Sequence, residues 1–96
     1  MSGKLVIIYS NVTSADEIHF FKKKPSFEEI YLLIDTDIIE IVPFVYEGVR
    51  REGYVDEEGL IKDKEVNIRA MEMDFFKGHR MGLPLVGDVA IWVPDE

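Results

Sequence analysis

Residues 25–43 read PSFEEIYLLIDTDIIEIVP and contain the signals for a short helix followed by a strand. Ser26 is a favourable N-cap, and Glu29, three residues later, completes a capping-box pattern. Apolar residues then recur at spacings of three and four as far as Ile34, which gives the helix one apolar face. So short a helix is not stable alone in water, and we expect it to pack against the rest of the chain.

The second half of this stretch predicts a strand at residues 38–42, where four of five residues are β-branched and apolar. Apolar side chains fall on both faces of this strand, and that pattern is typical of a strand inside a sheet. We therefore expect a central position for it. Pro43 has no N–H to donate, so it predicts a sheet edge, a bulge or the end of the strand.

The other predicted elements are placed around this unit. They are strands at 4–10, 18–22, 51–56 and 85–93, and a second short helix at 65–73. The first two strands are expected to pair antiparallel. The order β-β-α-β-β-α-β in 96 residues predicts a single domain, 1–96, of the α+β class, with short helices packed on a mostly antiparallel sheet. Residues 74–84 form an irregular loop, and loops of this length are often functional.

The net charge of −8 comes from 11 Lys and Arg against 19 Asp and Glu, which argues against direct binding to a nucleic-acid backbone. The charge is uneven: residues 25–60 hold ten acidic residues and two arginines, whereas residues 61–83 hold five basic residues, four acidic ones and a histidine. Cysteine is absent and no apolar run approaches membrane-spanning length. With no signal-peptide pattern at the start, we expect a cytoplasmic protein without membrane contact.

Three short motifs appear in order along the chain: YVDEEG at 54–59, VNIRA at 66–70 and LVGDVAI at 85–91. In these motifs the chain resembles a family of small proteins carried by bacteriophages and mobile elements, which is catalogued as a domain of unknown function. The helix-to-strand unit after Phe27 fits as well. Relatives have Gly-Gly-Tyr where this chain reads DTDI at 35–38. The resemblance implies a phage protein acting in the cytoplasm of a host cell, and it implies no particular reaction.

Candidate ligand-binding residues gather in the later part of the chain: Asn67, Arg69, Lys77, His79 and Arg80. An arginine fork with neighbouring cations can hold a phosphate or carboxylate, and an asparagine amide can read a base edge. Each has a plainer interpretation. Asn67 would cap the second helix, Arg69 would pair with Glu65 or Glu72, and the loop cations would simply be solvated.

Signals for catalysis are missing from the sequence. There is no nucleophile–base set, no phosphate-binding glycine loop ending in Lys-Ser or Lys-Thr, and no metal-ligand spacing. His19 is interpreted as a surface or half-buried residue on a strand, and Asp56, Glu57 and Glu58 as an acidic hairpin turn. We therefore predict no catalytic residue, no metal and no cofactor, and rank a small hydrolase last.

Two binding functions remain. The first is a non-enzymatic phage accessory protein that sequesters a small anionic, nucleotide-like host immune signal, with its pocket between the subunits of a homo-oligomer. The second is an acidic module that inhibits a host protein, for instance by imitating the charge of nucleic acid. The acidic residues of that module would be Asp35, Asp37, Glu40, Glu47, Glu52, Asp56, Glu57 and Glu58.

Overall fold

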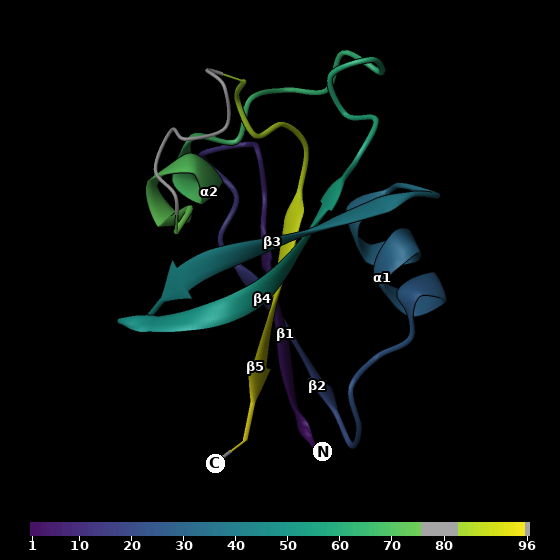
Figure 1. Cartoon of the computed structure of the whole chain (residues 1–96), viewed down its shortest axis with the longest axis vertical. Coiled ribbons are helices and arrows are strands. Elements are labelled where there is room, and N and C mark those ends of the chain that lie inside the picture. The colour runs from purple at the N-terminus through teal and green to yellow at the C-terminus, as the bar shows by residue number, and fades with distance from the viewer. Residues whose placement is uncertain (76–82, 96) are drawn as a thin grey trace.

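The computed structural model describes residues 1–75 and 83–95. Within them, five strands form one antiparallel sheet in the order β2-β1-β5-β4-β3 (Figure 1). The strands are β1 (Gly3–Ile8), β2 (Glu17–Phe21), β3 (Ile39–Tyr46), β4 (Val49–Asp56) and β5 (Val89–Pro94), and the helices are α1 (Phe27–Ile34) and α2 (Ile68–Met73). The predicted α+β class and the element order are confirmed, as is the antiparallel pairing of the first two strands.

Helix α1 begins as its sequence predicts. The Glu29 amide donates to the Ser26 hydroxyl at 3.3 Å, and the Glu29 carboxylate accepts from the Ser26 amide at 3.2 Å. Ile30 and Ile34 are the buried residues of the helix. The helix ends at Asp35, which takes a left-handed conformation with φ 54°. This short helix is therefore fixed by its cap at one end and by burial along one face.

Each face of the sheet carries one helix and one apolar core. Because neighbouring residues of a strand point to opposite faces, β1 contributes Leu5 and Ile7 to one core and Val6 and Ile8 to the other. The core under α1 consists of Leu5, Ile7, Ile30, Ile34, Tyr54, Ala90 and Trp92. The core under α2 consists of Val6, Ile8, Val42, Phe44, Val55, Ala70, Leu85, Val89, Ile91 and Val93. The first strand is thus covered on both faces, as expected.

The prediction of a central strand at 38–42 is wrong. The strand runs on through Pro43 to Tyr46, and β4 is its only neighbouring strand in the described part of the chain, so it forms an edge of the sheet. Its two apolar faces have separate causes: Val42 lies in the core under α2, and Ile39 packs against the core under α1. Ile41 remains 51% exposed. Pro43 stands at a sheet edge, one of the positions that its missing N–H allows.

The predicted ends of the other elements shift as well, and two starting points shift by three residues or more. The second helix starts at Ile68 rather than 65, and the last strand starts at Val89 rather than 85. The cause is a short antiparallel contact between residues 65–67 and 85–87. In it the Asn67 amide donates to the Leu85 carbonyl at 2.8 Å, and the Gly87 amide donates to the Glu65 carbonyl at 2.7 Å. This contact holds the start of α2 against the end of the chain.

Candidate functional site

Asn67 fixes the start of α2. Its side-chain nitrogen donates to the carbonyls of Ile8 and Gly87, both at 2.9 Å, and its side-chain oxygen accepts from the Ala70 amide at 3.0 Å. The residue is 0% exposed. The capping role anticipated from the sequence is confirmed. Both side-chain amide hydrogens of Asn67 are donated inside the fold, so neither is available to form a hydrogen bond with a ligand.

Arg69 lies two residues further on and pairs with Asp16, which comes directly before β2. The two groups form a fork-to-fork pair, with the second nitrogen 3.0 Å from its carboxylate oxygen. The hydrogen bond to Asp16 raises the pKa of Arg69, so its charge is permanent. The expected partners Glu65 and Glu72 are not the ones used. Arg69 keeps 41% of its side chain exposed, so a ligand could still reach its remaining N–H groups.

Lys77, His79 and Arg80 lie outside the described residues. The structure does fix the chain just before them. The Phe75 amide donates to the Pro43 carbonyl at 3.1 Å, and Asp74 bridges to Phe44 on the edge strand β3. Phe75, the last described residue before these cations, therefore lies at the outer edge of β3.

Two arginines of β4, Arg50 and Arg51, lie close to this edge of the sheet, and the candidate site predicted from the sequence did not include them. The Arg50 guanidinium stacks over the Phe75 ring, 4.7 Å from its centroid. Arg50 and Arg51 both line an open hollow of about 330 Å³ together with Ile41, Pro43 and Glu52. Among the described residues neither arginine forms an ion pair, and the Nε of Arg51 is buried without a hydrogen-bond partner. The only signal in the sequence was that these are the two cations of an acidic stretch.

A second hollow, of about 740 Å³, opens at the other end of the molecule between the C-terminus of α1 and residues 58–64. Two of its lining residues, Lys62 and Lys64, form ion pairs with the carboxylate of Asp56 at 3.0 Å and 2.8 Å, and the Asp56 side chain is 0% exposed. Burial opposes ionisation, but the hydrogen bonds from Lys64 and Lys62 outweigh it and lower the pKa of Asp56 to about 2. Lys64 also donates to the carbonyls of Ile34 and Asp35 at the end of α1.

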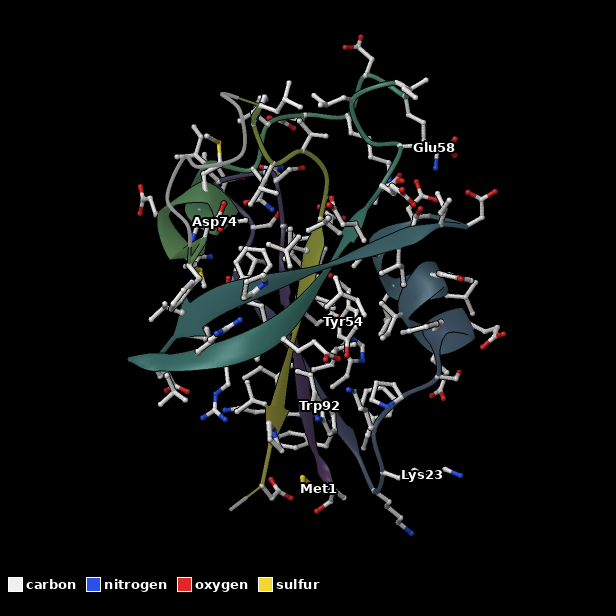
Figure 2. The ribbon with its side chains drawn as sticks, viewed as in Figure 1. Met1, Lys23, Tyr54, Glu58, Asp74 and Trp92 are labelled. Carbon is white, nitrogen blue, oxygen red and sulfur yellow. The ribbon has the colours of Figure 1, made fainter. Side chains whose placement is uncertain are left out.

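The rim of this second hollow is acidic and faces solvent, as the position of Glu58 in Figure 2 shows. Its exposed carboxylates are Asp35, Asp37, Glu58 and Asp63. Two of the eight acidic residues assigned to an interaction surface are not free for one. Asp56 is buried with its lysines, and Glu52 accepts from Lys24 at 2.7 Å and from the buried Tyr54 hydroxyl.

His19 belongs to a small polar group on β2 rather than to a metal site. Its ring contacts the Glu17 carboxylate, which also accepts from the Tyr9 hydroxyl at 2.7 Å. The Tyr9 bond, followed by the His19 bond, lowers the pKa of Glu17. Across residues 1–75 and 83–95 there is no group of three side chains suited to holding a metal ion. In the same residues, none of the helices combines the length and apolarity needed to span a bilayer.

Comparison with known proteins adds no relative: no family model, no curated protein sequence and no solved structure matches the chain.

Proposed function

We propose that this protein is a non-enzymatic phage accessory protein that binds a small anionic, nucleotide-like host immune signal in the host cytoplasm and keeps it from its receptor. The observation that carries the proposal is the pair of arginines on β4. Arg50 and Arg51 both line one hollow at the sheet edge, and neither forms an ion pair within the described residues, on a chain whose net charge is −8. Unpaired guanidinium groups on an acidic protein favour an anionic ligand that supplies the missing acceptors.

The position of the hollow supports the same site. Phe75 packs under Arg50, and Lys77, His79 and Arg80 follow it within five residues of sequence. The cation–π contact with the Phe75 ring holds the Arg50 guanidinium beside this hollow. Arg69 adds a permanent charge on α2, near Tyr46 at the closed end of the β3–β4 hairpin. The binding contacts proposed are therefore Arg50, Arg51 and Arg69 with the three later cations, and Asn67 holds α2 in place.

The test is thermal unfolding with a panel of mono-, di- and cyclic nucleotides, with the matching uncharged nucleosides as ligand controls. A ligand that binds only the folded state must raise the melting temperature. We expect one or more phosphorylated compounds to do so and Arg50→Ala to remove most of the shift. Absence of any shift across the panel at millimolar concentration would contradict the proposal.

A matched variant separates a local effect from a change in net charge. Lys22 is an exposed cation that forms no ion pair within the described residues, and it lies on the far side of the sheet from β4. Lys22→Ala changes the net charge as Arg50→Ala does, so we expect it to keep the full ligand shift. An equal loss in both variants would indicate a non-specific charge effect.

A second candidate function is supported by the acidic hollow at the other end of the molecule. Asp35, Asp37, Glu58 and Asp63 line it in exposed positions and would present negative charge to a basic site on a host protein. Such a complex would form rapidly and weaken as salt screens the charges. Capture from host lysate by the wild type, compared with Asp37→Lys, tests this candidate. A captured amount that changes neither with the salt concentration nor with the substitution would exclude this candidate.

A further inference from the structure

The two edges of the sheet differ in how they end. At the β3 edge, Pro43 lacks an N–H, its carbonyl is taken by the Phe75 amide, and Asp74 bridges to Phe44. At the β2 edge, nothing in the described part of the chain pairs with the backbone on the side away from β1. Figure 1 shows β2 as the outermost strand beside β1. An open strand edge is a template for another strand, so β2 is where a partner strand can add.

The free strand also exposes apolar side chains. Phe20 is 80% exposed and Ile18 45% exposed, and the two share the face of the sheet on which α2 lies. Their register partners in β1 are Lys4 and Val6. Burial of such an exposed phenylalanine by a partner is favourable, because it removes apolar surface from water.

The charges at the two ends of this strand decide which partner fits. The segment reads DEIHFFKKK over residues 16–24, with acidic residues at one end and lysines at the other. If two copies pair antiparallel about Phe20, the two Phe20 rings meet at the axis, and Glu17 of each copy lies at the end of the strand pair where Lys23 of the second copy follows the bend after β2. Parallel pairing would instead place like charges side by side, which is unfavourable.

We propose that β2 pairs with β2 of a second copy of this chain, antiparallel and centred on Phe20, so that two five-stranded sheets join into one. The pair is self-complementary, as a two-fold interface requires. A two-fold pair uses the β2 edge of both copies, so that edge is closed in the dimer, and at the other edge β3 is already covered at Pro43 and Phe44. Figure 2 shows the Lys23 side chain extending into solvent from the end of this strand, where it is free to reach the other copy. The inference does not depend on the proposed ligand.

Reversal of the charge pair tests the register. Sedimentation of the full chain over a range up to about 1 mM covers the weak affinities typical of small interfaces. We expect the wild type to dimerise, Lys23→Glu to weaken the dimer about tenfold or more, and the Glu17→Lys, Lys23→Glu double variant to recover affinity. A wild type that stays monomeric throughout, or a double variant no better than Lys23→Glu, overturns the proposal.

A second experiment does not rely on the charge pair. The chain has no cysteine, so Phe20→Cys carries a single thiol at the proposed axis. With mild oxidant, two such thiols facing each other across the strand pair join rapidly into a covalent dimer. Leu32→Cys is the matched control, because Leu32 is 86% exposed on α1 and lies away from β2. Equal or slower cross-linking at position 20 than at position 32 overturns the arrangement.

Discussion

At the scale of single residues, two buried polar side chains hold distant parts of the chain together. Asp56 ties the end of β4 to Lys62 and Lys64, and Lys64 continues to the last carbonyls of α1. Asn67 ties the start of α2 to the ends of β1 and of the loop before β5. Both side chains have their hydrogen-bond partners, which is the condition for burying a polar group without loss of stability.

The Asp56 carboxylate makes stability depend on pH. Its pKa lies at about 2 in the folded chain against an ordinary 3.8, so its contribution is complete above pH 4 and is lost as the pH falls toward 2. We expect urea unfolding to show a loss on the order of 2 kcal/mol over that range from this group. Asp56→Asn should lack this component, whereas Asp37→Asn, at an exposed carboxylate 3.5 Å from Lys62, should retain it.

Removal of the Asn67 side chain should be costly. Asn67→Ala loses the N-cap of α2 and leaves the Ile8 and Gly87 carbonyls buried without their donors. We expect a loss of about 2–4 kcal/mol in the free energy of unfolding by chemical denaturation. Ser26→Ala removes a cap that is exposed to water and should cost only about 1 kcal/mol. Similar losses in the two variants would show that the buried bonds contribute little.

At the scale of elements, the β3–β4 hairpin turns through two residues with positive φ, Glu47 at 52° and Gly48 at 77°. This is the geometry of the two-residue turn in which Asn-Gly is preferred. Glu47→Asn should therefore raise the free energy of unfolding by about 0.5–1 kcal/mol. Glu57→Asn removes the same charge at an exposed position without positive φ and should leave it nearly unchanged. A gain from both would point to charge relief instead of backbone geometry.

The elements whose signals are local were predictable from the sequence. The Ser26–Glu29 capping box, the Glu47-Gly48 turn and the run of apolar residues in β1 all lie within a few residues of the structure they produce. The edge position of β3 was not predictable in this way, because it depends on which strands pair with β4. A strand whose two faces meet two different cores looks central from its sequence, whatever its place in the sheet.

The candidate site shows the same limit at longer range. The partner of Arg69 is Asp16, 53 residues earlier, and only the folded β1–β2 connection brings it there. Arg50 became a candidate because its guanidinium contacts Phe75. That contact exists because residues 74 and 75 pair with the edge of β3, which the sequence did not indicate. Asn67, by contrast, was recognised as a cap from its place before an apolar segment, and that interpretation was confirmed.

At the scale of the whole molecule, the sheet separates two apolar cores, with α1 over one and α2 over the other. The acidic hollow lies at the end of α1, and the arginine hollow is lined by residues of β3 and β4. Most residues that line the arginine hollow alternate onto the face of the sheet that carries Ile39 and Tyr54 of the core under α1, so both candidate surfaces lie on the α1 side of the sheet. Figure 1 shows the two helices on opposite sides of this sheet.

Because the sheet separates the two cores, mutations in one core should change the stability independently of mutations in the other. A cavity in one core, made by Ile34→Val, and one in the other, made by Val42→Ala, share no neighbouring side chains, so their stability losses should sum within about 0.5 kcal/mol. Denaturation of both single variants and the double variant measures this, and a larger discrepancy would show that the sheet transmits strain. Under additivity, selection could change the packing of the core under α2 without altering the core under α1, on whose side both candidate surfaces lie, so specificity and part of the stability would evolve as separable traits.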